Sequence, residues 1–161
     1  MWRKRRTNVN DDARARALVA AQFLALGMLA LPERRCRRSG RRRALGWGII
    51  VGGGALAAAG AAALGPDLRP LPLPRAGATL RSSGPYSQLR HPIYAGIFTA
   101  AVGRTIATGG RRHALATVGL GAILSAKARL EEKLLGDVVD YPAYEAAVPR
   151  WGLGRSGRGR K

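Results

Sequence analysis

Four apolar stretches alternate with polar, arginine-rich segments along the chain of 161 residues. The stretch 44–65 contains no charged residue, and it is longer than the ~20 residues that a helix needs to cross the hydrocarbon core of a bilayer. The other stretches are shorter and cover residues 17–31, 93–110 and 113–126. This pattern predicts an all-α integral membrane protein with about four transmembrane helices.

The first apolar stretch follows a basic N-terminal tail, residues 1–16. A basic start and a short apolar core also occur in signal peptides, but Pro32-Glu33-Arg34-Arg35 stands where a small-residue cleavage site is expected. We therefore expect an uncleaved first span. With the second stretch it forms an N-terminal transmembrane pair, residues 17–65.

The second apolar stretch is rich in small residues. Glycine weakens a helix in water, whereas in a bilayer small residues let neighbouring helices approach closely. We therefore expect this helix to pack against others through its glycines, which include Gly52, Gly53, Gly54 and Gly60.

Residues 66–151 form a second unit, which begins with a proline-rich connector. The stretches 93–110 and 113–126, separated by Arg111-Arg112, predict a helical hairpin in the membrane. From Lys127 the helix leaves the membrane. A short cytoplasmic C-terminal helix then follows, with its start marked by Asp140 and Pro142 and its end by Pro149. Residues 152–161 form a basic tail that we expect to be disordered.

The formal net charge of +19 allows two kinds of partner, nucleic acid or an anionic membrane surface. The long apolar runs between the basic blocks favour membrane lipids, with no specific nucleic acid. Lys and Arg are more numerous on the side that holds both termini, which predicts cytoplasmic termini. The arginine-dense loop 34–43 then lies outside, unless 17–31 rests in the interface instead of crossing.

Metal ligands are scarce in this sequence. Cys36 is the only cysteine, and His91 and His113 are far apart along the chain. We therefore expect neither a disulfide within the chain nor a metal site.

The first segment with candidate chemistry is RSSGPYSQLRHPIYAG, residues 81–96. Pro92 biases His91 away from helical geometry and suits the first turn, so His91 lies at or beside the N-cap of the third apolar helix. Tyr94 lies within that first turn, where free backbone N–H groups favour an anionic ligand such as a cofactor carboxylate. The alternative is an interfacial belt made of Tyr86, Arg90, His91 and Tyr94.

The second segment is Lys127-Ala-Arg129-Leu-Glu131-Glu132-Lys133. Gly121, Ser125 and Ala128 lie on the same helical face as Glu132, so a smooth face leads to a carboxylate at the membrane surface. That arrangement can admit a cofactor. The alternative is ordinary charge pairing along a helix, in which each pair contributes a few tenths of a kcal/mol.

Together these segments resemble the isoprenylcysteine carboxyl methyltransferases and their phospholipid-methyltransferase relatives. The resemblance covers residues 64–151 and follows the order of the family's motifs: GPYxxxRHPxYxG, a membrane hairpin, RxEExxL and YxxYxxxVPR. In this chain they correspond to residues 84–96, 129–135 and 141–150. The leucine- and valine-containing stretch 135–141 departs from the family, which usually carries a bulky aromatic after its Glu pair.

The resemblance implies a methyltransferase that uses S-adenosylmethionine, with a lipid-like or prenylated acceptor and an active site on the cytoplasmic side of the cell membrane. Tyr86, His91, Tyr94, Glu131 and Glu132 would bind the cofactor. Arg90 and Glu132 would act in catalysis, where Arg90 would orient the acceptor or the cofactor carboxylate.

Two other readings remain open. An NADPH-dependent sterol-reductase-like enzyme carries a related RHPNY motif, but Ile93 stands in place of its asparagine and Glu131-Glu132 in place of its Arg-Asp pattern. A non-catalytic membrane protein could keep the same scaffold and bind anionic lipid through its arginines.

Overall fold

The computed structural model describes residues 9–33, 39–71, 80–136 and 140–152. All regular structure in these ranges is helical, which confirms the predicted all-α class. The α-helices are α1 (Val9–Ala30), α2 (Gly40–Leu64), α3 (Pro92–Thr108), α4 (Arg111–Leu135) and α5 (Tyr141–Ala147), and the short 3-10 helices are η1 (Gly65–Asp67) and η2 (Gly84–Ser87).

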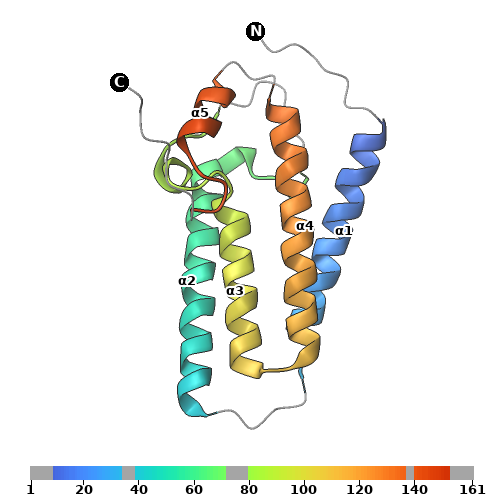
Figure 1. Ribbon diagram of the computed structural model, residues 1–161, viewed down its shortest axis with the longest axis vertical. Helices are drawn as coiled ribbons and strands as arrows, with labels where there is room; N and C mark the ends of the chain where they lie inside the picture. The colour runs from blue at the N-terminus through green and yellow to red at the C-terminus, as the bar shows by residue number, and fades with distance from the viewer. Residues whose placement is uncertain (1–8, 34–38, 72–79, 137–139, 153–161) are drawn as a thin grey trace.

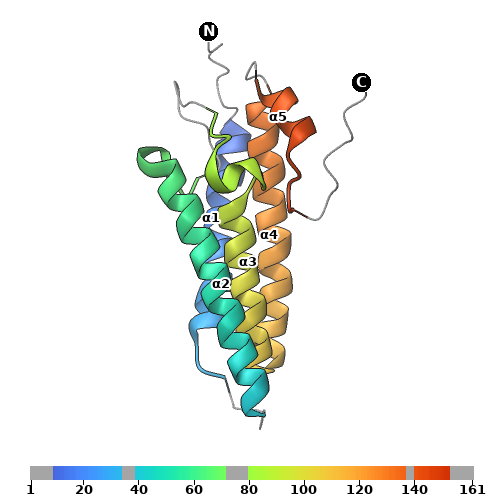
Figure 2. The same ribbon diagram turned by 90° about the vertical axis from the view of Figure 1, so that its left-hand side faces the viewer.

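Helices α1 to α4 form an up-and-down bundle (Figures 1 and 2). Helix α3 packs against both α2 and α4, and α1 packs on α4. Since successive helices run in opposite directions, the start of α3 and the end of α4 meet at one end of the bundle. Helix α5 lies at that same end (Figure 1).

Helix α1 begins earlier than the apolar pattern predicts. It starts at Val9 and so includes half of the segment interpreted as a basic tail. Asp11 and Asp12 lie in its first turn, where their negative charges interact favourably with the positive end of the helix dipole and stabilise the helix. Residues 1–8, the centre of the arginine-dense loop with Cys36, part of the proline-rich connector and the tail 153–161 lie outside the described residues.

The helical hairpin is present, but its turn lies two residues earlier than predicted. Helix α3 ends at Thr108, and the next residue, Gly109, adopts the left-handed conformation with φ 69°. Arg111 and Arg112 therefore belong to the first turn of α4. Glycine accepts positive φ without steric cost, and this decides where the chain reverses.

Helices α2 and α3 touch backbone to backbone. The three buried residues of α2 are all glycines, Gly46, Gly53 and Gly60. A Cβ added to Gly53 would lie 2.6 Å from the backbone oxygen of Gly96, and one added to Gly46 would lie 2.7 Å from that of Gly103. The predicted close packing of the glycine-rich helix is confirmed, with Gly46 as an additional contact point, whereas Gly52 and Gly54 face open space.

The side-chain core lies between the other helices. It joins Ala25 and Leu29 of α1 to Ala101 of α3 and to a row on α4, namely Ala116, Leu120 and Leu124. The row has the i, i+4, i+8 spacing of one helical face, which explains how α4 can bury these residues against α1 and α3.

Two of the described helices are long and apolar enough to cross a membrane, α1 and the segment from α2 through η1, Gly40–Asp67. Large apolar side chains on them face outward, among them Leu24 at 72% exposure and Val51 at 67%. Helices α3 and α4 do not meet the same standard, because α3 has only 17 residues and the last turns of α4 are densely charged.

Replacing Gly53 by alanine is expected to lower the free energy of unfolding by ~1–3 kcal/mol, because the new methyl group meets the backbone of α3. Gly52→Ala is the matched control. It adds the same methyl group to open space and should leave stability unchanged or slightly higher. Equilibrium unfolding in detergent, followed by circular dichroism, measures both, and equal effects would contradict the proposed contact.

Candidate functional site

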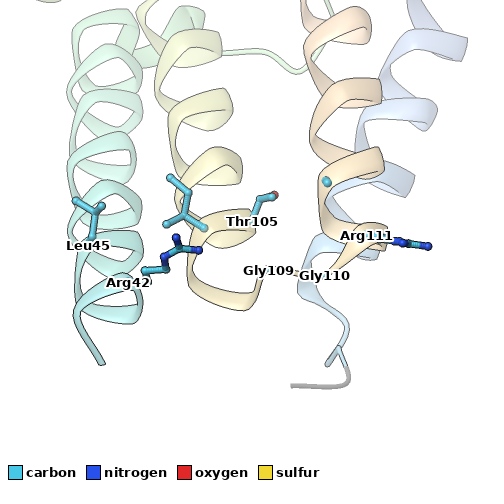
Figure 3. Close-up of a pocket in the computed structure, with 8 residues that line it drawn as sticks. Arg42, Leu45, Thr105, Gly109, Gly110 and Arg111 are labelled. Atoms are coloured by element: carbon cyan, nitrogen blue, oxygen red, sulfur yellow. The ribbon is translucent and has the colours of Figure 1, made fainter. Parts of the chain in front are cut away.

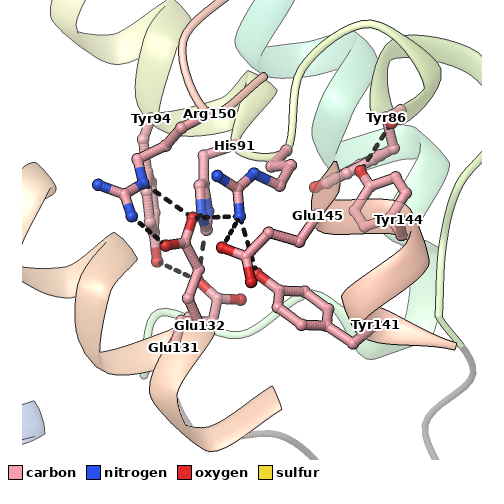
Figure 4. Close-up of polar contacts among 10 residues, drawn as sticks. Tyr86, His91, Tyr94, Glu131, Glu132, Tyr141, Tyr144, Glu145 and Arg150 are labelled. Carbon is pink, nitrogen blue, oxygen red and sulfur yellow. Dashed lines mark hydrogen bonds and ion pairs between the residues drawn. The ribbon is translucent and has the colours of Figure 1, made fainter. Parts of the chain in front are cut away.

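The candidate site lies at the end of the bundle where α3 begins and α4 ends. Pro92 occupies the first position of α3, so His91 stands just before the helix with non-helical backbone angles. Tyr94 follows within the first turn, and Glu131 and Glu132 lie on the last turns of α4. Figure 4 shows these side chains converging, with Arg150 approaching from the segment after α5.

Glu132 is at the centre of the cluster. Its Oε1 accepts a hydrogen bond from Arg150 Nε at 2.9 Å and contacts His91 Nε2 at 3.0 Å and Arg90 Nη1 at 3.2 Å. Its Oε2 accepts from Arg150 Nη2, which makes the Arg150 pair bidentate. The side chain is only 7% exposed. Three segments distant in sequence therefore share one buried carboxylate.

The electrostatics of Glu132 follow from these contacts. Burial by itself would raise the pKa of this carboxyl, but the hydrogen bonds from His91 and Arg150, together with the charges of His91 and Arg90, lower it to about 2. Glu132 lies beyond the apolar stretch 113–126. It is therefore ionised at any physiological pH and attracts the surrounding cations.

Glu131 differs from its neighbour in exposure. Its Oε2 accepts a hydrogen bond from the Tyr94 hydroxyl at 3.2 Å and lies 3.6 Å from His91 Nδ1. The side chain is 32% exposed, compared with 7% for Glu132. Of the two carboxylates, Glu131 is therefore the one that a molecule entering from solvent can reach.

Arg90 connects the cluster to α5. Its Nη1 donates to Glu145 Oε1 at 2.5 Å and to the Tyr141 hydroxyl at 3.5 Å, and its backbone N–H donates to the Pro149 carbonyl at 3.1 Å. Burial disfavours the charged guanidinium, but the bond to Glu145 and the charge of Glu132 outweigh it and raise the pKa of Arg90. Arg90 Nε is buried and has no hydrogen-bond partner among the described residues.

Two aromatic rings, those of Tyr94 and Trp151, pack against His91 in the cluster. The rings of His91 and Tyr94 stack with centroids 5.4 Å apart and planes 3° from parallel. The ring of Trp151 also packs against His91, with the two ring centroids 6.1 Å apart. Stacked and tilted rings of this kind offer flat apolar faces together with fixed polar edges.

Tyr86 belongs to the same surroundings, although it comes from η2. It is buried, and its backbone oxygen accepts a hydrogen bond from the Tyr144 hydroxyl at 2.7 Å (Figure 4). Burial, and then the charge of Glu131, raise the pKa of Tyr86 above its ordinary value. The phenol therefore stays protonated at neutral pH.

Lys127 supports the site from within the bundle. It is 1% exposed, and its Nζ donates to Gln22 Oε1 of α1 at 2.6 Å and to the Pro70 carbonyl at 2.9 Å. The ammonium also lies 5.1 Å from the centroid of the Tyr94 ring, a cation–π contact. One buried cation thus joins α1, the connector and α4 to a residue of the candidate site.

The structure brings Arg90, His91, Tyr94, Glu131 and Glu132 together in one cluster, and these residues were all candidates from the sequence. Sequence reasoning did not assign Arg150, Trp151, Lys127 or Glu145 to the site. The YxxYxxxVPR motif, which ends at Arg150, was a usable signal for this residue. For Lys127 there was none, because its partners come from α1 and the connector.

Comparisons with known proteins add no relative. No protein-family model, no curated protein and no solved structure matches the chain. The chemistry and geometry of the site are therefore the indicators of function.

Acid should weaken the fold through Glu132. Because its folded-state pKa of about 2 lies below the ordinary value of 4.5, its contribution is complete above about pH 4.5 and disappears as the pH falls toward 2. The difference in unfolding free energy between the wild type and Glu132→Gln should therefore shrink across that window. Unfolding titrations at a series of pH values measure it, and a constant difference would rule out this role.

Lys127→Met should lower the free energy of unfolding by ~1–3 kcal/mol, because Gln22 Oε1 and the Pro70 carbonyl lose their buried donor. Lys133→Met is the control. The Lys133 side chain is 66% exposed, and its ion pair with Asp11 Oδ1, at 3.5 Å, lies at the surface and contributes little to stability. Adding Gln22→Leu to Lys127→Met should recover part of the loss. Equal losses for Lys127→Met and Lys133→Met would contradict the assignment.

Proposed function

We propose that this chain is a membrane-embedded methyltransferase that uses S-adenosylmethionine and acts on a lipid-like or prenylated acceptor. The observation that carries the proposal is the convergence of His91 and Tyr94 with Glu131 and Glu132. These two pairs belong to separate motifs of the family that the sequence resembles, and a full helical hairpin separates them along the chain.

The residues of the site fit the proposed cofactor chemically. Arg90 Nε is a buried donor without a partner among the described residues and suits a ligand carboxylate. The Glu131 carboxylate suits an ammonium group or ribose hydroxyls, and the Tyr94 and Trp151 rings suit a flat base. Carboxylates and aromatic faces also stabilise a positively charged sulfonium.

The geometry supports a division of labour between the two carboxylates. Both oxygens of Glu132 are held by Arg90, His91 and Arg150, so this residue orders the cluster. Glu131, which is more exposed, makes the direct contact with the ligand. The catalytic role that the family resemblance implies for Glu132 thereby becomes one of positioning Arg90 and His91.

When bound, the cofactor supplies a methyl group for in-line transfer to the acceptor. The protein's part is to hold two reactants in line and to exclude water, and positioning of this kind can contribute several kcal/mol to the rate. The fixed Arg90–Glu132–Arg150 network is suited to that task because its side chains are already immobilised before a ligand enters.

The membrane arrangement belongs to the same proposal. Helices α1 and α2 cross the bilayer and α3 and α4 complete a four-span bundle, with Arg104 extending its guanidinium to the Leu29 carbonyl at 3.1 Å instead of facing lipid. The site then lies at the cytoplasmic surface, and its acceptor enters from the lipid phase.

A non-catalytic scaffold is the second candidate, because the full engagement of Glu132 is also what a purely structural ion cluster would show. The two functions differ in whether Glu131 binds anything. Its partial exposure makes it possible to replace this residue without dismantling the buried cluster.

Binding of S-adenosylmethionine to the protein in nanodiscs, measured by equilibrium dialysis with labelled ligand, tests the proposal. Glu131→Gln and His91→Ala should weaken binding by about ten- to a hundredfold, which corresponds to the loss of one charge-assisted contact. Asp67→Asn is the control, because that carboxylate pairs with Arg81 at 3.6 Å outside the cluster.

Each result decides between the candidates. No binding by the wild type would eliminate the methyltransferase and leave the scaffold. Binding that is unchanged in both site variants would place the cofactor elsewhere. Binding of NADPH without S-adenosylmethionine would favour the reductase-like enzyme.

A further inference from the structure

A groove of about 430 Å³ lies at the opposite end of the bundle from the candidate site. It is formed where α2 begins, α3 ends and α4 begins (Figure 3). Its lining combines aliphatic and cationic side chains, chiefly Arg42 and Leu45 of α2, Thr105 and Ile106 of α3, and Arg111 and Ala114 of α4.

The cations of this groove are uncompensated within the part of the chain that the structure describes. Arg42 and Arg111 are exposed and have no ion-pair partner there. Figure 3 shows the Arg42 side chain directed toward α3, over the groove, while Arg111 points outward at the opposite rim. A ligand in the groove therefore meets positive charge on one side.

The acidic residue Glu33 lies at this end of the bundle and already has partners on α4. Glu33 accepts hydrogen bonds from the backbone N–H groups of Arg112 and His113, both at 3.3 Å, and lies 3.2 Å from His113 Nδ1. Glu33 thus caps the start of α4 and leaves the groove arginines without a carboxylate. The N–H groups of Arg112 and His113 at that helix terminus are therefore already hydrogen-bonded, and the proposed binding does not depend on them.

The position of the groove along the candidate membrane span α2 indicates the kind of anion. Arg42 lies in the first turn of α2, a candidate membrane span, and the side chains just beyond it are apolar and outward-facing: Leu45 is 59% exposed and Trp47 53%. A basic side chain followed by an exposed Trp and aliphatic residues is typical of the headgroup boundary of a bilayer.

We propose that this groove binds the headgroup of an anionic phospholipid. The phosphate lies against Arg42, Arg111 adds a second positive charge at the rim, and the upper part of an acyl chain lies against Leu45 and Ile106. This site is independent of methyl transfer. A lipid fits better than a soluble polyanion, because the aliphatic side chains in the lining, Leu45, Ile106 and Ala114, would remain exposed to water beneath a fully polar ligand.

Lipid titration of the detergent-solubilised full chain tests the proposal, with the thermal unfolding midpoint and native mass spectrometry as readouts. Phosphatidylglycerol should raise the midpoint and stay bound, and phosphatidylcholine should do so much less. Arg42→Gln should weaken phosphatidylglycerol binding about five- to tenfold, and Arg111→Gln less. Arg41→Gln and Arg43→Gln are matched controls, because they remove the same charge from neighbouring positions outside the groove lining.

Three results would overturn the site. Equal weakening by Arg41→Gln and Arg42→Gln would mean diffuse attraction to a basic surface. Equal binding of both lipids would mean that the anion is not recognised. Full competition by soluble glycerol phosphate at concentrations similar to those of the lipid would mean that the groove binds a free phosphate compound and that the acyl chain plays no part.

Discussion

The buried carboxylate of Glu132 is the interaction on which the functional end of this molecule depends. It pairs with Arg90 and His91, which stand just before α3, and with Arg150 in the segment after α5. Burying one charge is costly, and the cost is offset only when the charge is fully paired and hydrogen-bonded. The pairing therefore has to include all three partners, and this requirement brings three separate segments to one place.

The backbone contact between α2 and α3 explains why this cluster is held in register. Gly53 and Gly96 allow the two helices to approach so closely that no side chain separates them. A seam of this kind has little room to slide, because every shift brings a Cβ against backbone atoms. The start of α3, and with it His91, is thereby fixed relative to α2, while Lys127 fixes α4 relative to α1.

The two ends of the bundle are chemically different. At one end cations and carboxylates neutralise one another in a buried network, with Glu131 left accessible at its margin. At the other end the carboxylate of Glu33 caps a helix, and Arg42 and Arg111 remain exposed around a partly aliphatic groove. The first arrangement suits a polar, partly cationic ligand and the second suits an anion. A chain with a formal net charge of +19 thus uses its positive charge in two distinct ways.

Much of this could be predicted from the sequence, for identifiable reasons. Periodicity and length predict the helices, because apolar runs without charge have few alternatives to helix in or near a membrane. Motif order predicts that His91 and Tyr94 meet Glu131 and Glu132, because a hairpin returns the chain to the surface from which it came. The start of α1 at Val9 and the turn at Gly109 were missed, since caps and left-handed glycines are signals of one or two residues.

Only the tertiary structure decided the partners of the charges. Composition shows that Lys127 and Arg150 are basic, but not that one is buried against Gln22 and Pro70 while the other clamps Glu132. Likewise, the spacing of α2's glycines permits close packing on several faces, and the fold selects Gly46, Gly53 and Gly60. Local pattern determines which segments are helical because it acts over a few residues, whereas ion pairs and backbone contacts depend on distances between segments that only the packed bundle sets.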